Sequence, residues 1–316
     1  MKNAMMNGSR MVKGIVLLLC LIFFSQTCAY GEDKKIVLKK YPDFKIGFTT
    51  QNFAKVMPPT VANIKKMLDF ASKQGFSFIE IRDPEAKLTL AECKDLAAYG
   101  KKKGVEIVLA VNPGLLDANY WEIFSRAIAN ANVLNGPKVV RTGGNGNEMV
   151  KDTSKQYWTA AEFKQLIENA NKAANTAKMF GLQFLIENAR EGIKGDGINT
   201  FGTADFFGSK GVNSNVGLQL DVANFFCITR VPSSADQIKS FMDDNAEKIG
   251  YTHLKSSIKL KAQPVLNGND LPFEEYFTYL KKYRKNYIAI ELDAANTLAE
   301  ATANHIKSIE YLKKNY

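Results

Sequence analysis

Short apolar runs alternate with longer amphipathic segments eight times between residues 44 and 316. The short runs are apolar at consecutive positions, as expected of parallel strands that are buried on both faces. The longer segments carry helix signals, such as Thr60 after two prolines at the start of one segment and Gly104 at the end of another. The pattern therefore predicts the α/β class and a single (β/α)8 barrel, rather than a doubly wound sheet.

The expected strands and helices follow one another in strict order along the chain. The strands are expected at 44–50, 77–82, 105–111, 137–143, 182–187, 216–221, 250–255 and 287–293. The helices are expected at 60–72, 90–103, 120–134, 160–180, 203–209, 235–248, 273–283 and 298–314. The connections after the fourth, fifth and seventh strands are long, and long loops at this end of a barrel usually contact or cover a ligand.

The first 29 residues have the pattern of an export signal. Lys2, Arg10 and Lys13 precede an apolar run at 14–24 that is too short to span a bilayer comfortably, and small residues follow near position 30. We expect a signal peptide at 1–29, a charged leader at 30–43, a barrel at 44–316 and no integral membrane span. The protein is then exported to the periplasm or, if Cys28 accepts a lipid, anchored at the cell surface.

The net charge and the placement of the lysines bear on the class of binding partner. The formal net charge is +10, and three of the positive side chains lie in the signal, which leaves about +7. The lysines are scattered over helix surfaces without interleaved aromatic residues, so we expect no nucleic-acid partner.

Cys93 and Cys227, the two cysteines beyond the signal, are not expected to pair, so the core must stabilise the fold. The sequence leaves open whether the protein forms a homo-oligomer.

Four polar residues end the last four apolar runs: Glu187, Asp221, His253 and Glu291. The gaps between them are 34, 32 and 38 residues, about one strand–helix–strand unit each. Because active sites form at the carboxyl ends of the strands in such barrels, we expect these side chains to meet there. Three carboxylates and one imidazole predict a divalent-metal site, with Mn²⁺ as the first choice and Mg²⁺, Co²⁺ and Zn²⁺ as alternatives.

A metal site of this kind suits sugar chemistry. A divalent cation can chelate the carbonyl and a neighbouring hydroxyl of a sugar and stabilise the enediolate that forms when a carbon-bound proton leaves. Carboxylates beside the sugar can remove and return that proton. The same site could instead eliminate a neighbouring group, and the fold does not choose between these outcomes.

At these strand ends the chain resembles the xylose isomerase-like TIM-barrel superfamily, in the segments FLIENA, LQLDVANF, THLKS and IAIELD. Weaker similarity lies in KIGFTT, GFSFIEIRD and VVRTGG, so the resemblance covers 44–316. The most similar branch holds ketose 3-epimerases, hydroxypyruvate isomerase and inosose dehydratase. The resemblance implies that Glu187, Asp221, His253 and Glu291 bind the metal and that Glu187 and Glu291 are the catalytic acid/base pair.

Two positions depart from the family pattern. Asn224 stands where the family often has His, and Ser256 stands where it often has Asp. In the sugar isomerase and epimerase branch, both positions contact the substrate or the residues around it. The substrate and the reaction type of this chain therefore stay open. The endonuclease branch of the superfamily needs many more histidines than His253 and His305, the two in this chain. We expect His305, in the last helix, to be an ordinary surface or core-edge residue.

Other polar and aromatic residues are candidates for substrate binding. Lys255 lies two residues past His253 on the same strand face and could hold a substrate oxygen or pair with an acid. Glu80 ends the second strand and could bind substrate or form a structural salt bridge with Arg82. Trp158 could stack on a sugar ring or pack against a helix. The predicted substrate-binding residues are Asn224, Lys255, Glu80 and Trp158.

The sequence thus predicts an exported, divalent-metal-dependent sugar isomerase or epimerase of carbohydrate metabolism, with a small, unphosphorylated carbohydrate as its partner. The alternative is a metal-dependent lyase or hydratase that acts on 3-keto-glycosides with the same site. A third alternative is a non-catalytic carbohydrate-binding barrel, but the intact set of ligand residues argues against it.

Overall fold

The computed structural model of this chain describes residues 35–144, 155–189, 191–228 and 232–316. The predicted signal peptide, Cys28 and the start of the leader lie outside the described residues. The rest of the predicted leader packs against the barrel: Ile36 and Leu38 are buried, and the backbone N–H of Lys40 donates to the carbonyl oxygen of Tyr316 at 2.6 Å. The segment packs in this way because apolar side chains lie between Lys35 and Lys39.

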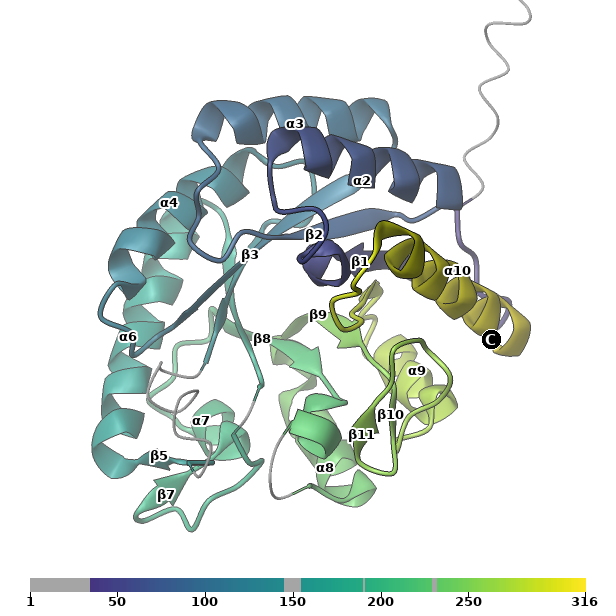
Figure 1. Cartoon of the computed structure of the whole chain (residues 1–316). Coiled ribbons are helices and arrows are strands. Elements are labelled where there is room, and N and C mark those ends of the chain that lie inside the picture. The colour runs from purple at the N-terminus through teal and green to yellow at the C-terminus, as the bar shows by residue number, and fades with distance from the viewer. Residues whose placement is uncertain (1–34, 145–154, 190, 229–231) are drawn as a thin grey trace, which may run out of the picture. The chain divides into compact units, whose positions relative to one another are not determined.

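Eight parallel strands close into a barrel, which confirms the predicted fold (Figure 1). Each strand pairs with the next barrel strand along the chain, and the last pairs with the first. The barrel strands are β1 (Lys45–Thr49), β2 (Phe78–Arg82), β3 (Glu106–Gly114), β4 (Val139–Gly143), β6 (Gln183–Glu187), β8 (Val216–Asp221), β9 (Ile249–Leu254) and β12 (Tyr287–Ile290).

The helices surround the barrel on its outside (Figure 1). They are α2 (Val61–Gln74), α3 (Leu90–Lys102), α4 (Tyr120–Val133), α6 (Ala160–Met179), α7 (Thr203–Gly208), α8 (Ala235–Asn245), α9 (Phe273–Lys282) and α10 (Leu298–Asn315). Thr89, Thr159 and Ser234 begin α3, α6 and α8 with capping boxes, in which the cap side chain and the third helical residue bond each other's backbone. The predicted helices are therefore present, with boundaries that differ by a few residues.

The sequence pattern missed several short elements. A 3-10 turn at Ala246–Lys248 replaces the end that we predicted for α8, and other short turns lie at Thr50–Phe53 and Asn224–Ile228. Two antiparallel ribbons, β5 (Trp158–Thr159) with β7 (Thr200–Phe201) and β10 (Ser257–Ile258) with β11 (Lys261–Ala262), lie in the long connections. These ribbons brace the connections next to the strand ends.

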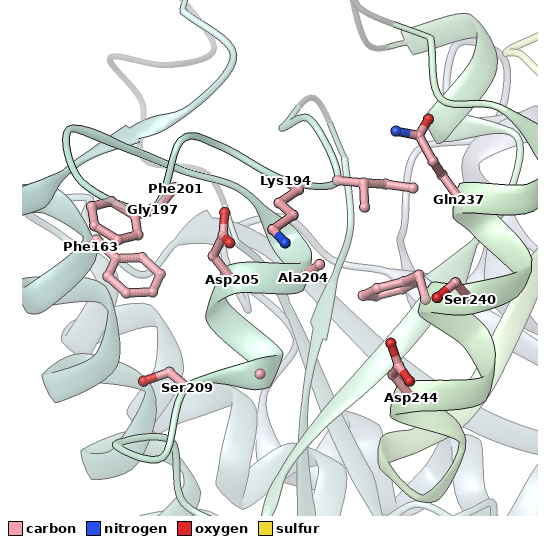
Figure 2. A pocket seen from close by; sticks show the side chains of 13 residues that line it. Phe163, Lys194, Gly197, Phe201, Ala204, Asp205, Ser209, Gln237, Ser240 and Asp244 are labelled. Carbon is pink, nitrogen blue, oxygen red and sulfur yellow. The ribbon is translucent and has the colours of Figure 1, made fainter.

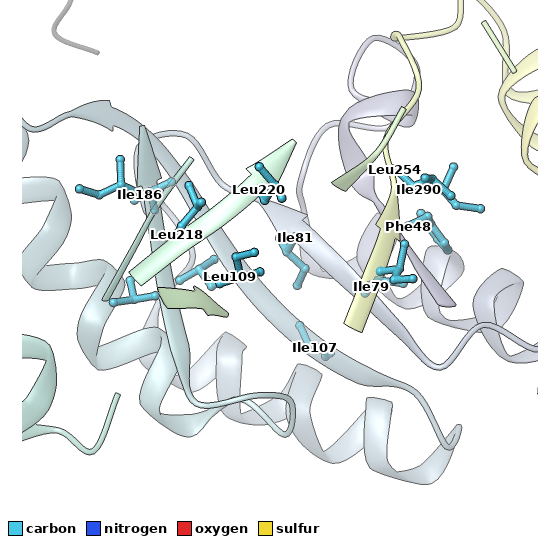
Figure 3. Packing of buried hydrophobic residues seen from close by; sticks show 14 of the residues in the cluster. Phe48, Ile79, Ile81, Ile107, Leu109, Ile186, Leu218, Leu220, Leu254 and Ile290 are labelled. Carbon is cyan, nitrogen blue, oxygen red and sulfur yellow. The ribbon is translucent and has the colours of Figure 1, made fainter. Parts of the chain in front are cut away.

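Successive side chains along each strand point alternately into two different layers. Outward-facing residues such as Ile79, Ile81 and Leu109 pack in the large layer between barrel and helices (Figure 3). Inside the barrel, Phe78 and Leu185 belong to a smaller apolar cluster. Glycines make room for this cluster, since a Cβ at Gly217 or Gly250 would lie 2.5 or 2.7 Å from the Leu185 side chain. The interior positions nearer the strand ends are polar, so the apolar cluster forms a floor beneath the candidate site.

Among the described residues, no helix is long and apolar enough to cross a membrane. Cys93 and Cys227 are both free, as expected from the sequence. The core, rather than a disulfide between these two cysteines, therefore stabilises the described part of the chain.

His305 is fully buried, which corrects the surface or core-edge position expected from the sequence. Its ring stacks on Phe53, with centroids 5.4 Å apart, and lies 4.7 Å from Phe48 and about 6 Å from Phe70 and Phe76. Neither ring nitrogen has a hydrogen-bond partner among the described residues. Because burial disfavours the charged form, the pKa of His305 falls to about 3.

Replacing His305 with Phe should make the protein more resistant to acid. Above the ordinary histidine pKa of 6.5 the imidazole is neutral in the folded and unfolded chains and adds no pH dependence. Below it the unfolded chain binds a proton that the folded chain excludes until its own pKa of about 3, so stability is lost as pH falls through that window. By pH 4 the loss is about 3 kcal/mol in the free energy of unfolding.

Urea unfolding at pH 7 and pH 4 measures this difference. Wild-type protein should lose about 3 kcal/mol more than the His305→Phe variant between the two pH values. Equal losses would show that His305 takes up its proton in the folded protein.

Candidate metal centre

The barrel brings the four strand-end residues together as the sequence predicts. Glu187 and Asp221 are the last residues of β6 and β8, His253 lies near the end of β9, and Glu291 directly follows β12. The strand register pairs Asp221 with His253 as neighbours. All four residues are buried, and one donor atom from each lies within 4.8 Å of the others.

Each of the three carboxylates has one oxygen engaged by the protein. A guanidinium N–H of Arg141 donates to Glu187 Oε2. The backbone N–H groups of Ala223 and Asn224 donate to Asp221 Oδ1 at 2.9 and 3.3 Å. The third carboxylate is held by two cations, since Arg82 Nη2 and Lys255 Nζ lie 3.1 and 3.5 Å from Glu291 Oε1.

The other oxygens face a common centre. Glu187 Oε1 and Glu291 Oε2 lie 3.1 and 2.6 Å from His253 Nδ1. Asp221 Oδ2 lies 3.1 Å from Lys255 Nζ. Neither Asp221 Oδ2 nor Glu291 Oε2 accepts a hydrogen bond of ordinary geometry from the described residues. Three carboxylate oxygens and one imidazole nitrogen converging in this way fit the preferences of a divalent cation.

Three buried cations oppose the negative charge of the site. Burial alone raises the pKa of Glu187 and Glu291, but Arg141 and Arg82 outweigh it at Glu187, and Lys255 and Arg82 outweigh it at Glu291, so both pKa values are lowered. Burial and the neighbouring glutamates raise the pKa of Asp221, and Lys255 offsets this only in part. The two glutamates are therefore held ionised by their cation partners.

Sequence reasoning missed Arg141. It lies inside the barrel on β4 and is 1% exposed. Besides its bond to Glu187, its Nε donates to Gln219 Oε1 at 3.1 Å and its Nη1 to the carbonyl oxygen of Val111 at 3.3 Å. The available signal was an arginine within the apolar run VVRTG, where a charge is costly unless it has a partner.

Glu80 lies beneath the four strand-end residues and is 0% exposed. Arg82 Nε donates to its Oε1 at 3.1 Å, while the Tyr251 hydroxyl and His253 Nε2 both contact its Oε2, the latter at 2.8 Å. Burial alone would raise the pKa of Glu80, but the charge of His253 and the two arginines lower it. Protein groups take up the whole carboxylate, so the structure gives no support for the substrate contact expected from the sequence.

Asn224 and Lys255 lie next to each other beside the four strand-end residues. Asn224 Oδ1 accepts from Lys255 Nζ at 3.1 Å, and its Nδ2 donates to the carbonyl oxygen of Asn188 at 2.9 Å. At the second departure from the family pattern, the Ser256 hydroxyl accepts from the backbone N–H of Asn267 at 2.9 Å and is 0% exposed. Asn224 therefore orients Lys255, and Ser256 anchors the loop that follows β9.

Trp158 does not line the metal centre. It is 2% exposed, lies on β5 and packs near Phe206, with ring centroids 6.3 Å apart. This burial favours the packing alternative over a contact with the sugar ring.

A separate groove lies between α7 and α8, outside the barrel (Figure 2). Its volume is about 540 Å³, and its walls include Phe163, Phe201, Lys194, Gln237 and Asp244. It contains none of the four strand-end residues, so it is not part of the candidate centre.

Removing Arg141 should destabilise the protein strongly, because it leaves Glu187 and Gln219 without their buried partner. We expect Arg141→Met to lower the free energy of unfolding by about 3 kcal/mol in protein without added metal. The exposed pair of Lys87 and Glu85 is the control, and Lys87→Met should change stability by less than about 1 kcal/mol. Urea unfolding measures both, and equal effects would contradict the role given to Arg141.

Comparison with known proteins places the chain in a family. The family model described as a xylose isomerase-like TIM barrel matches residues 68–315. A search of curated protein sequences finds no significant match.

Solved structures share the fold at low sequence identity. D-psicose 3-epimerase with D-tagatose from Clostridium cellulolyticum H10 is 15% identical, with a TM-score of 0.59 over 85% of this chain and 99% of that chain. A xylose isomerase-like TIM barrel protein from Mycobacterium smegmatis in complex with magnesium is 14% identical, with a TM-score of 0.61 over 86% and 97%. An AP endonuclease, family 2, from Brucella melitensis is 13% identical, with a TM-score of 0.59 over 85% and 99%. These likenesses establish the fold.

Proposed function

Because this chain belongs to the xylose isomerase-like TIM-barrel family, we propose that it is a divalent-metal-dependent sugar isomerase or epimerase. The reaction is a proton transfer next to a carbonyl, through an enediolate. Family membership and sugar epimerases among the similar structures support the reaction class, and the magnesium complex in the Mycobacterium smegmatis protein supports a cation at the same fold.

One observation carries the proposal. Three carboxylates and one imidazole direct one donor atom each to a shared centre, while cations or backbone amides hold the other carboxylate oxygens. A cluster of surface acids would not need this support. We propose Glu187, Asp221, His253 and Glu291 as the metal ligands and Mn²⁺ as the cation, with Mg²⁺, Co²⁺ and Zn²⁺ as alternatives.

The chemistry divides between the cation and the side chains. A bound divalent cation would polarise the substrate carbonyl and offset the charge of the enediolate. Glu187 and Glu291, which come from different strands, remove the carbon-bound proton and return it. Lys255 donates a hydrogen bond to a substrate oxygen, and Asn224 keeps the Lys255 ammonium in position through their 3.1 Å contact.

The position of Lys255 also favours a second candidate, a lyase acting on 3-keto-glycosides. Its ammonium lies 3.5 Å from Glu291 Oε1. Burial alone would lower the pKa of Lys255, but Asp221 and Glu291 raise it, so the group stays protonated. A charged hydrogen-bond donor beside the base could stabilise the oxygen of a departing alcohol or sugar, a group that elimination releases and isomerisation does not.

We also retain the export proposal. The N-terminal pattern supports a periplasmic or lipid-anchored protein, and an exported enzyme would meet free sugars or glycosides rather than sugar phosphates. Mass spectrometry of the mature N-terminus distinguishes cleavage near residue 30 from lipidation of Cys28 or retention of the signal.

Glu291→Gln should keep the fold and lose turnover, because a carboxamide cannot accept the carbon-bound proton. We expect a loss of at least ~100-fold in kcat, together with weaker metal binding. Saturating the variant with Mn²⁺ before the assay separates the two effects. Near wild-type turnover under those conditions would remove Glu291 from the mechanism.

Product analysis in deuterated water decides between the two candidate reactions. An isomerase or epimerase should give a product that keeps the carbon and oxygen skeleton of the substrate and carries solvent deuterium at carbon. A lyase should release an alcohol or sugar beside an unsaturated keto-sugar. D-psicose, D-tagatose and a 3-keto-glycoside are the first substrates to compare by mass spectrometry, and release from the glycoside without isomerised sugar would overturn the leading proposal.

A further inference from the structure

The two edges of the His253 ring face different acids. On one edge, Nδ1 lies 2.6 Å from Glu291 Oε2 and 3.1 Å from Glu187 Oε1, two of the oxygens that face the centre. On the other edge, Nε2 lies 2.8 Å from Glu80 Oε2. The ring is 1% exposed and sits between these two sets of acids.

Glu80 is well suited to hold that second edge. Arg82 Nε engages one of its oxygens, and the Tyr251 hydroxyl shares the other with His253. The carboxylate therefore has partners that fix its direction and none of its surface is open to a ligand. Glu80 can act on the chemistry only through the residues that it contacts.

We propose that Glu80 is a positioning residue of the metal centre, which fixes His253 so that Nδ1 binds the cation. This inference rests on the proposed metal site. A neutral imidazole carries one N–H, and the acceptor of that N–H determines which nitrogen keeps its lone pair for a metal. With Nε2–H donated to Glu80, the lone pair of Nδ1 points to the oxygens of Glu187 and Glu291.

The charge of Glu80 matters as well as its shape. A carboxylate that accepts a hydrogen bond from a histidine makes the imidazole a stronger metal ligand. Losing such a partner typically costs about 10–100-fold in metal affinity or activity. Glutamine has nearly the same shape but no charge, and its amide can present an N–H to Nε2. Aspartate keeps the charge, but its side chain is one methylene group shorter and holds the carboxylate further from His253.

The same barrel offers a matched control in Glu106 on β3. Its carboxylate accepts from Lys45 Nζ at 2.8 Å and from the Tyr287 hydroxyl at 2.7 Å, so it too joins a cation and a phenol between strands. It contacts none of the four proposed ligands. Glu106→Gln thus reproduces the loss of a cross-strand carboxylate without touching His253.

The histidine content makes a direct readout practical. The chain has two histidines, so protein without a tag and labelled with ¹⁵N at histidine gives imidazole signals from His253 and His305 alone. Zn²⁺ is the probe, because it is diamagnetic. In wild-type protein, Zn²⁺ should shift the His253 signals to the pattern of a ring bound through Nδ1 and protonated at Nε2, and the His305 signals should not move.

Zn²⁺ affinity, measured by competition with a chelator, supplies the second readout. We expect the Kd to rise about 10–100-fold in Glu80→Gln, to recover in part in Glu80→Asp and to stay unchanged in Glu106→Gln. A purely structural role for Glu80 would lower stability in Glu80→Gln but leave the Kd of the folded protein unaltered.

The outcomes separate this inference from the proposed function. Binding through Nε2, or equal affinity in Glu80→Gln and wild type, would overturn the role of Glu80 and leave the metal site intact. Wild-type protein that binds no Zn²⁺ would overturn the proposed function and this inference together. If Glu80→Gln does not fold, the wild-type spectrum and Glu80→Asp still decide which nitrogen binds and whether Glu80 supports it.

Discussion

The candidate site depends on the pairing of four buried carboxylates with cations inside the barrel; these are Glu80, Glu187, Asp221 and Glu291. An unpaired buried carboxylate costs several kcal/mol, by general estimates for proteins. Three permanent cations, Arg82, Arg141 and Lys255, lie among the four acids and each contacts at least one of them. At Glu187 and Glu291 this pairing has a directional consequence, since the nearest cation contacts one carboxylate oxygen and leaves the other directed to the centre. The charge balance of the interior therefore also shapes the proposed metal site.

The fold supplies this arrangement through the alternation of side chains along each strand. On β2, Ile79 and Ile81 face the helices while Glu80 and Arg82 face the interior. Phe78 and Leu185 fill the interior below the charged residues and keep water from that end. A single strand thus stabilises the barrel with one face and contributes charged residues to the candidate site with the other. The four proposed ligands lie at the carboxyl ends of their strands, the end at which such barrels place their active sites.

The repeating pattern of the sequence was enough to predict the barrel and to bring the four proposed ligands together, because position at a strand end is a local property. The contacts behind the ligands were not predictable in this way. The inward position of Arg141 and its bond to Glu187 depend on how β4 and β6 pair, and the contact between Glu80 and His253 crosses the interior between β2 and β9. Neither relation is visible in a run of residues.

Two other residues show the same limit. His305 has an ordinary helical position in sequence, and only the packing of α10 against the phenylalanines around it makes the residue buried. Trp158 lies near a long connection, but it pairs with Phe201 across the β5–β7 ribbon, and its side chain is buried in the core. Burial at these positions is decided by contacts with segments distant in sequence.

The proposed site binds one divalent cation where the four strand ends meet. Anomalous diffraction from a crystal of the protein soaked in Mn²⁺ tests this proposal. We predict one strong anomalous peak within bonding distance of oxygens of Glu187, Asp221 and Glu291 and of Nδ1 of His253. A crystal that shows no peak there, or a peak only at other residues, would contradict the proposal.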